Sequence, residues 1–390
     1  MKTVPNTSLP PRFLLIGGYA QSLVNFRGPL LQALRNAGCD VHAAAPAIED
    51  DPVIAAALHD MGVTTHSIPI ARAGLNPMAD LKTLASLVQL MRRTRPTMVL
   101  GYTIKPVIWG AFAAWIAGVP RRYAMITGLG YAFSDDTKGK RGLVQSLARR
   151  LYRAALARVE RVFFQNPDDL ELFRSMAIIS PRQSATVVNG SGVDLVHFPP
   201  RPLPAGPLRF LMIARLLGDK GVREYAAAAA AVRRHHPDIG FHLVGGLDAN
   251  PDAIDEAEVR RWAEAGDIVW HGPQADVRPF LADSHIFVLP SAYREGTPRT
   301  ILEAMATGRP VITTDAPGCR ETVTDGFNGY LIPTRSADAL AAAMRRFATT
   351  PGLVNEMAKR SLDLAREKYD ADKVAAVMLD AMGVTGTQRP

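Results

Sequence analysis

The chain has 390 residues, of which 47% are hydrophobic and 21% are charged, a balance that excludes an intrinsically disordered protein. Its length suffices for two or three domains with buried cores. The two cysteines, Cys39 and Cys319, lie far apart in the sequence. They predict neither a disulfide framework nor a metal site, and they favour a reduced, cytosolic setting.

Basic charge is concentrated in the first half of the chain. Residues 1–200 hold 22 Lys and Arg against 13 Asp and Glu, a net charge of +9, whereas the remaining residues sum to −1. A basic half indicates an anionic ligand, for which nucleic acid, an acidic membrane surface and a diphosphate-bearing acceptor are the candidates. The longest apolar stretch, Pro106–Pro120, is too short to span a bilayer and predicts a buried core helix. The first residues lack the apolar segment of a signal peptide.

Two strand-like runs each open a series in which apolar runs alternate with helical patterns. The first run, Phe13–Ile16, precedes a helical pattern from about Leu30, and the second, Phe210–Ile213, precedes an Ala-rich helical segment around residues 225–232. Further strand-like runs are Met98–Leu100, Arg161–Phe164, Phe241–Val244, Ile286–Leu289 and Pro310–Thr313. Short buried strands that alternate with helices indicate parallel sheets covered by helices on both faces.

Proline-rich segments separate the two series. Residues 199–200 and 202–207 favour a linker, because proline fixes φ and removes amide donors. The predicted fold class is therefore α/β, with two doubly wound Rossmann-like domains that face a cleft. We expect an N-terminal domain over residues 1–197 and a C-terminal domain over 198–364, with a C-terminal helix over about 365–386 that crosses back to the first domain.

The strongest local signal is the segment Glu295–Val323, EGTPRTILEAMATGRPVITTDAPGCRETV. Glu295 precedes a predicted helix and is placed to hold hydroxyls of a sugar ring, whereas Glu303 lies about one turn inside the helix and can accept both hydroxyl protons of a ribose diol. Each acid alone is equally typical of a residue that complements a helix dipole. The helix is predicted to begin near Pro298 or Arg299, because proline is favoured in the first turn. The loop and the free amides at the helix start favour a diphosphate site, for which the candidates are Gly296, Thr297, Pro298 and Arg299.

This segment resembles the E-x7-E signature of the family 4 retaining glycosyltransferases, and further matches extend over both halves of the chain. The resemblance implies a GT-B fold, in which the N-terminal domain over residues 1–197 binds the acceptor and the C-terminal domain over 198–364 binds a nucleotide sugar. It implies a catalytic contact of Glu295 with the donor sugar and a contact of Glu303 with the nucleotide ribose. It also implies that Arg215 and Lys220 act in catalysis by binding the donor diphosphate. Three glycines are counted with the donor-binding residues: Gly17 and Gly18, which match the glycine turn after the first strand, and Gly245.

Within that family, the chain resembles bacterial enzymes that extend sugars on undecaprenyl diphosphate. The segments that carry this resemblance are residues 26–30 (FRGPL), 102–106 (YTIKP), 126–130 (ITGLG) and 163–169 (FFQNPDD). It implies a UDP-sugar donor, transfer of a hexose or N-acetylhexosamine to a polyprenyl-diphosphate-linked glycan, and a role in O-antigen, capsule, lipopolysaccharide or glycoprotein synthesis. No metal or other cofactor is expected, and the expected location is the cytoplasm or the cytoplasmic face of the inner membrane.

The acceptor side is predicted in the basic half, with Arg27, Lys105 and Thr127 as candidates, although Lys105 is also compatible with a plain surface lysine. Many family members have a histidine at the end of the strand occupied here by residues 124–126, and this chain has Thr127-Gly128 instead. A histidine-dependent role is therefore not transferable. Residues 128–136 predict a mobile acceptor loop, and residues 143–161 a basic amphipathic helix that lies on anionic lipid or packs on the sheet.

Three other classes of protein fit the sequence less well. A nicotinamide-dependent oxidoreductase is disfavoured because no G-x-G-x-x-G follows either opening strand. A sugar-nucleotide epimerase or a phosphorylase on the same fold would need acids, bases or a cofactor lysine pattern that do not stand out. A non-catalytic nucleic-acid binder is disfavoured because the basic residues are not interleaved with aromatic ones.

Overall fold

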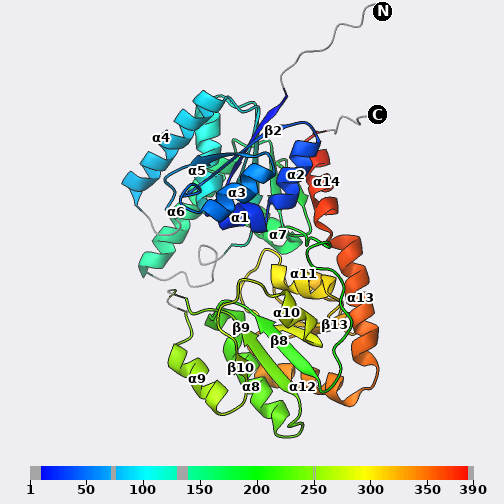
Figure 1. Ribbon diagram of the computed structural model, residues 1–390. Coiled ribbons are helices and arrows are strands. Elements are labelled where there is room, and N and C mark those ends of the chain that lie inside the picture. Colours follow the sequence, from blue (N-terminus) through cyan, green and yellow to red (C-terminus); the bar gives the residue numbers. More distant parts are fainter. Residues whose placement is uncertain (1–9, 72–75, 130–138, 249, 251, 385–390) are drawn as a thin grey trace, which may run out of the picture. The chain divides into compact units, whose positions relative to one another are not determined.

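A computed structural model describes residues 10–71, 76–129, 139–248, 250 and 252–384 (Figure 1). The chain divides into two compact units, which are called the first and the second domain below. The first domain comprises Met1–Val188 and Val374–Pro390, and the second comprises Asn189–Lys373. The divisions thus fall at residues 188/189 and 373/374, whereas the sequence predicted boundaries at 197/198 and 364/365.

The described part of the first domain contains a seven-stranded sheet in the order β3-β2-β1-β4-β5-β6-β7, and all of its paired strands are parallel. The strands are β1 (Arg12–Ile16), β2 (Asp40–Ala45), β3 (Thr64–Ser67), β4 (Met98–Tyr102), β5 (Arg121–Ile126), β6 (Arg161–Phe164) and β7 (Ser184–Val187). The helices are α1 (Gln21–Asn25), α2 (Gly28–Asn36), α3 (Pro52–Asp60), α4 (Pro77–Thr94), α5 (Ile104–Ile116), α6 (Gly139–Leu156), α7 (Pro167–Ser175) and, from Val374 onward, α14 (Ala371–Ala381).

The described part of the second domain contains a six-stranded parallel sheet in the order β10-β9-β8-β11-β12-β13. Its strands are β8 (Arg209–Ile213), β9 (Gly240–Val244), β10 (Val269–Trp270), β11 (Ile286–Leu289), β12 (Val311–Thr314) and β13 (Gly329–Ile332). Its helices are α8 (Val222–Arg233), α9 (Glu256–Glu264), α10 (Arg278–Ala282), α11 (Arg299–Ala306), α12 (Ala337–Thr349) and α13 (Leu353–Lys368), with two 3-10 turns, η2 (Gly218–Lys220) and η3 (Arg320–Thr322).

Both faces of each sheet are covered, which explains the continuous apolar runs in the sequence. In β1, Phe13 and Leu15 belong to a core with α2, α3 and α14, whereas Leu14 and Ile16 belong to another core with α4 and α5. Successive side chains of a strand point to opposite faces, so a strand buried on both sides reads as one apolar run. The two doubly wound α/β domains predicted from the sequence are confirmed.

The C-terminal segment that was expected to be one helix over about 365–386 consists of two helices. Helix α13 ends at Lys368 and α14 begins at Ala371. At the break, the carbonyl of Tyr369 accepts a hydrogen bond from the Val193 amide (2.7 Å), and the Ala371 amide donates to the Val193 carbonyl (3.1 Å). These backbone groups bond to another segment, so the helix cannot continue through them.

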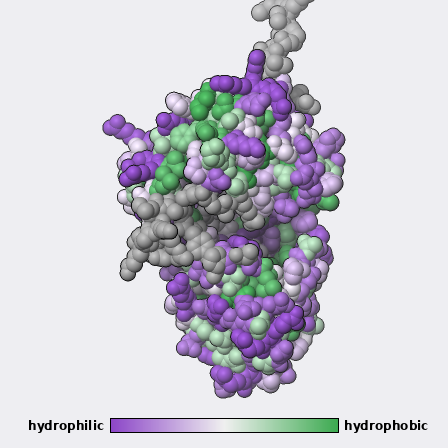
Figure 2. Space-filling model, turned by 90° about the vertical axis from the view of Figure 1, so that its left-hand side faces the viewer, coloured by the Kyte–Doolittle hydropathy of each residue, from purple (hydrophilic) through white to green (hydrophobic). Residues whose placement is uncertain are grey.

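The surface mixes polar and apolar side chains. On the face shown in Figure 2, apolar groups are interspersed with hydrophilic ones. The predicted basic amphipathic helix appears as α6, which places Tyr152 and Ala155 in the core of the first domain and therefore packs on the sheet. In the described part of the chain, no helix combines the length and the apolar character needed to cross a bilayer.

Candidate functional site

The strand order of the second domain determines which loops can meet. From β8 the chain proceeds to β9 and β10 on one side, and it then returns to place β11 on the other side of β8. In open α/β sheets, ligands bind beyond the carboxyl ends of the strands at such a reversal. The loops that follow β8 and β11 therefore leave the sheet side by side, and they carry Lys220 and Glu295.

Lys220 and Glu295 form an ion pair at this position. The Lys220 ammonium contacts Glu295 Oε1, and the two side chains are only 15% and 12% exposed. The Lys220 Nζ also lies 5.2 Å from the centre of the Tyr293 ring. A buried ion pair is weak evidence for stability, because desolvation offsets the attraction between the charges. Charged groups held together beyond the ends of the strands are instead typical of a functional site.

Close backbone packing brings the two loops together. Gly221 has a φ of 77°, and a Cβ at this position would lie 2.2 Å from the Pro290 carbonyl oxygen, so only glycine fits. The carbonyl of Asp219 accepts hydrogen bonds from the amides of Ala292 (2.8 Å) and Tyr293 (3.2 Å). The residues on either side of Lys220 are thus fixed to the loop that leads into Glu295.

Arg215 lies in the loop that follows β8, but its side chain pairs with a residue outside the Lys220–Glu295 pair. Its Nη1 lies 2.7 Å from Oδ2 of Asp248, a residue of the segment after β9, and the Arg215 side chain is 53% exposed. Gly245 is the first residue after β9, and a Cβ there would lie 1.8 Å from the Ala214 carbonyl oxygen. The Gly245 position therefore requires glycine because the backbone of the β8 loop passes so close.

Glu303 lies on α11, whose start at Arg299 with Pro298 as the N-cap matches the predicted helix start. Arg299 Nε donates to Glu303 Oε1 (2.9 Å) from one turn earlier in the helix. Burial raises the pKa of Glu303 to about 7, against the opposing effect of the Arg299 guanidinium. The loop before this helix is also tightly packed, since a Cβ on Gly190 would lie 2.8 Å from Thr297 Cβ. On its other side, a Cβ on Gly318 would lie 2.6 Å from the Gly296 carbonyl oxygen.

The remaining expected site residues lie in the first domain. A Cβ on Gly17 would lie 2.4 Å from the Tyr102 hydroxyl oxygen, and one on Gly18 would lie 2.8 Å from Thr103 Oγ1, so the glycine turn passes close to the end of β4. Thr127 follows β5. Residues 130–136, which make up most of the acceptor loop predicted over 128–136, lie outside the described residues.

The two basic acceptor candidates of the first domain both have partners. The Arg27 side chain is buried, with its guanidinium 4.8 Å from the centre of the Tyr102 ring. Lys105 is not a plain surface lysine, because its Nζ lies 2.8 Å from Asp80 Oδ1 and both side chains are largely buried. The pair connects α5 with α4.

Sequence reasoning gave no role to several residues that hold the site together. Asp248 and Asp80 pair with two of the expected cations, and the Asp219 carbonyl joins the two loops of the second domain. The Ser291 hydroxyl contacts Glu295 Oε1 at 3.0 Å. The sequence signal that could have indicated this contact is the position of Ser291, four residues before Glu295.

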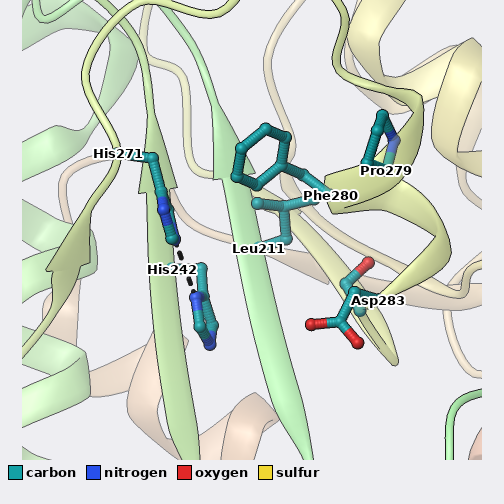
Figure 3. Close-up of a pocket in the computed structure, with 7 residues that line it drawn as sticks. Leu211, His242, His271, Pro279, Phe280 and Asp283 are labelled. Carbon is teal, nitrogen blue, oxygen red and sulfur yellow. Dashed lines mark hydrogen bonds between the residues drawn. The ribbon is translucent and has the colours of Figure 1, made fainter.

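Some cavities contain none of the expected site residues. The cavity in Figure 3 has a volume of about 220 Å³ and lies among Leu211, His242, His271, Phe280 and Asp283, with Pro279 and Ser284. His242 Nδ1 and His271 Nε2 are 2.9 Å apart, and burial lowers the pKa of both rings. Among the described residues, no three or more His, Cys, Asp or Glu side chains are grouped as a metal site would require.

Two family models match the chain. The model described as a glycosyl transferase 4-like domain matches residues 26–190, and the model described as glycosyl transferases group 1 matches residues 207–350. The first match lies in the first domain apart from its last two residues, and the second match lies wholly within the second domain.

Two curated relatives match over most of their length. The chain is 27% identical over 367 residues to the N,N'-diacetylbacillosaminyl-diphospho-undecaprenol alpha-1,3-N-acetylgalactosaminyltransferase of Campylobacter jejuni, covering 91% of this chain and 93% of the relative. It is 28% identical over 314 residues to the UDP-Gal:alpha-D-GlcNAc-diphosphoundecaprenol alpha-1,3-galactosyltransferase of Escherichia coli, covering 77% and 78%.

Solved structures show the same fold at low identity. Sucrose-phosphate synthase from Thermosynechococcus elongatus superposes with a TM-score of 0.76 at 19% identity, covering 95% of this chain and 98% of that one. Anabaena HepE in complex with UDP and glucose gives a TM-score of 0.76 at 18% identity, covering 96% and 100%. With a 4-like domain followed by a group 1 domain, the chain belongs to the family 4 glycosyltransferases and has the GT-B fold.

Proposed function

We propose that this enzyme transfers a hexose or N-acetylhexosamine from a UDP-sugar to a polyprenyl-diphosphate-linked sugar, with retention of the anomeric configuration. The product would belong to a bacterial surface polysaccharide or glycoprotein glycan. The Campylobacter and Escherichia relatives support this proposal, since both are named for alpha-1,3 transfer to an undecaprenyl-diphosphate-linked sugar. The observation that carries it is the largely buried Lys220–Glu295 pair, which lies where the strand order reverses.

In the proposed reaction, the bond between the sugar C1 and the donor phosphate oxygen breaks while the acceptor hydroxyl oxygen bonds to C1. The transition state resembles an oxocarbenium ion, with positive charge on the sugar ring and negative charge on the departing UDP. The acceptor's proton passes to the leaving phosphate, so no side chain is assigned as a general base. Neither a metal ion nor another cofactor has a role in this scheme.

The cations of the second domain would stabilise the departing diphosphate. The Lys220 ammonium has three N–H donors and can serve Glu295 and phosphate oxygens together. Arg215 would turn from Asp248 toward the phosphates. Backbone amides at the start of α11, with Gly296, Thr297, Pro298 and Arg299 around them, would add further donors.

The two glutamates would hold the sugar parts of the donor. Glu295 would accept hydrogen bonds from hydroxyls of the transferred sugar, and Glu303 from the ribose diol. Gly245 would allow the nucleotide to approach the end of β9, and Gly17-Gly18 would contribute from the first domain. Each assignment rests on the position of the residue at the carboxyl end of a strand or at the start of α11.

The acceptor diphosphate is assigned to the first domain, with Arg27, Lys105 and Thr127 as its contacts. At Lys105 it would share the ammonium with Asp80. The lipid tail of such an acceptor would bring the enzyme to the cytoplasmic face of the inner membrane. Co-sedimentation with vesicles that contain anionic phospholipid, compared with vesicles of phosphatidylcholine alone, tests that location.

A donor and acceptor panel tests the reaction. The enzyme is incubated with UDP-galactose, UDP-N-acetylgalactosamine, UDP-glucose or UDP-N-acetylglucosamine and with polyprenyl-diphosphate-linked N-acetylglucosamine or N,N'-diacetylbacillosamine, and the products are weighed by mass spectrometry. One donor is expected to add one sugar mass, with an alpha linkage by NMR and with the same rate in excess EDTA. Absence of any adduct, together with no binding of UDP, would refute the proposal.

A further inference from the structure

Ser291 is a fully buried serine that lies two residues beyond the end of β11, between that strand and Glu295 in the sequence. Its hydroxyl oxygen lies 3.0 Å from Glu295 Oε1 and 3.2 Å from the Asp219 carbonyl oxygen, and it accepts a hydrogen bond from the Tyr293 amide (3.2 Å). One small side chain thus contacts both loops that form the Lys220–Glu295 pair.

The chemistry of a hydroxyl decides between these contacts. A serine hydroxyl has one proton to donate and two lone pairs that accept. Because the Tyr293 amide occupies a lone pair, the single proton is available for either the Glu295 carboxylate or the Asp219 carbonyl. Hydrogen bonds to a charged acceptor are the stronger ones, so the bond to Glu295 is favoured. Glu295 Oε1 is also the atom that Lys220 contacts.

The backbone of Ser291 is itself held in place. Residues 290–291 have left the sheet, so their carbonyl groups lack partners in the strand ladder. The Thr314 hydroxyl, at the end of the neighbouring strand β12, donates to the Ser291 carbonyl, and the Thr313 hydroxyl donates to the Leu289 carbonyl (2.7 Å). All four of these residues are buried, which fixes the origin from which the Ser291 side chain reaches Glu295.

We infer that Ser291 is a positioning residue, whose hydroxyl holds the Glu295 carboxylate in the orientation in which it meets the donor sugar. This inference rests on the proposed function, in which Glu295 touches the transferred sugar. Such a role predicts a loss that is expressed in the chemical step, since a displaced carboxylate misplaces the sugar in the transition state while most donor contacts remain.

The test compares Ser291→Ala with a matched serine at the opposite end of the same strand. Ser284 is also buried and its hydroxyl donates to the Leu281 carbonyl (3.0 Å), but it precedes β11. With UDP-galactose and UDP-N-acetylgalactosamine as donors, we expect Ser291→Ala to lower kcat about 10- to 100-fold, as for a lost hydrogen bond to a charged group, with the donor KM changed by less than about threefold. Ser284→Ala should keep kcat within about twofold of wild type.

Two further variants separate positioning from a structural effect. Ser291→Thr keeps the hydroxyl and should recover most of the lost kcat. In the Glu295→Gln background, Ser291→Ala should lower kcat little further, because the carboxylate that the Ser291 hydroxyl orients is already absent. Thermal unfolding of all variants shows whether lost activity follows lost stability.

The inference is overturned if Ser291→Ala retains wild-type kcat, if Ser291→Thr is as slow as Ser291→Ala, or if the losses from Ser291→Ala and Glu295→Gln multiply. Wild-type activity of Ser291→Ala beside an inactive Glu295→Gln would remove this inference alone. Wild-type activity of Glu295→Gln would remove the proposed site and this inference with it.

Discussion

The first strands of the two domains have almost the same sequence and the same place in their sheets. The domains differ in the loops that follow the carboxyl ends of their strands. Strands β1 and β8 have the sequences RFLLI and RFLMI, and each lies between the next strand of the chain and the strand at which the order reverses. Even a pair of hydrogen-bonded histidines recurs beside them. His42 Nδ1 lies 2.8 Å from His66 Nε2, and His242 Nδ1 lies 2.9 Å from His271 Nε2.

The difference lies in the loops that come after the strands. In the first domain, the loops at the carboxyl ends of β1 and β4 carry Gly17-Gly18 and Thr103, and Thr103 has a φ of 67° and a ψ of 161°. Lys105, at the start of α5, forms an ion pair with Asp80 on the neighbouring helix α4. In the second domain, the loops at the carboxyl ends of β8 and β11 carry Lys220 and Glu295, which form an ion pair with each other. A shared sheet thus determines where a ligand can bind, and the loop residues determine which chemistry occurs there.

The largest expected effect is on the ion pair of the second domain. Lys220→Ala and Glu295→Ala are each expected to lower turnover about 100- to 1000-fold, equivalent to about 2.7–4 kcal/mol of transition-state stabilisation, with the fold intact. Lys105→Ala in the first domain should instead raise the KM for the acceptor and leave the KM for the donor unchanged. Steady-state kinetics with both substrates varied distinguish the two patterns.

A matched control for these variants is Arg223→Ala. Arg223 is a basic residue of the same domain with a carboxylate partner, since its Nε donates to Glu258 Oε1 (2.7 Å), but it lies on α8. It should leave turnover within about twofold of wild type, as expected for a partly exposed ion pair. Equal losses in Arg223→Ala and Lys220→Ala would mean that general charge, and not the pair, matters.

The second-largest expected effect is a pH dependence of the unfolding free energy, which comes from Glu303. Its folded-state pKa of about 7 lies above its ordinary value of 4.5, so the folded state binds the proton more tightly than the unfolded state. This contribution to stability is complete below pH 4.5 and is lost as the pH rises through 7. Relative to Glu303→Gln, the wild type should therefore lose about 2–3 kcal/mol of unfolding free energy between pH 5 and pH 8.

Denaturant unfolding at pH 5 and pH 8, without nucleotide, measures that difference. Glu303→Gln is the appropriate variant because it stays neutral at both pH values while keeping the shape and an acceptor oxygen for Arg299. Parallel pH profiles of the two proteins would show that Glu303 does not titrate in this range.

A third comparison uses the glycines that bring loops together in each domain. Gly221→Ala is expected to lower the unfolding free energy by about 2 kcal/mol, because its Cβ meets backbone and its φ is positive. Gly18→Ala should cost less, because the nearest atom to its Cβ is the side-chain oxygen of Thr103, which can rotate away. Chemical denaturation of both variants checks the order, and a larger loss for Gly18→Ala would reverse the comparison.

The smallest effect is expected at Asp248. This carboxylate holds Arg215 in the structure, and Asp248→Asn would make the guanidinium more available to the donor diphosphate. Because Arg215 is half exposed, the pair contributes little, and the donor KM should fall about two- to fivefold. Isothermal titration with UDP gives a direct measurement, and weaker UDP binding would indicate that Asp248 orients Arg215 for the donor.

Much of the fold and part of the site could be predicted from sequence. Runs such as Phe13–Ile16 and Phe210–Ile213 predicted buried strands because residues covered on both faces must all be apolar. The start of α11 was predicted because proline is favoured there and glycine allows a loop before it. The break between α13 and α14 at Tyr369 was not predicted, because it depends on backbone hydrogen bonds to Val193, which is far away in the chain.

The sequence by itself determined the element types, the two α/β domains and the residues with the charge to handle a sugar diphosphate, because these follow from local pattern and side-chain chemistry. Only the tertiary structure decided the partners: Lys220 with Glu295, Arg215 with Asp248, Lys105 with Asp80. These pairs join residues that are 25 to 75 positions apart. The first two encounters depend on which strands lie side by side, and the third depends on the packing of α5 beside α4. Both result from packing of the whole domain and not from any local signal.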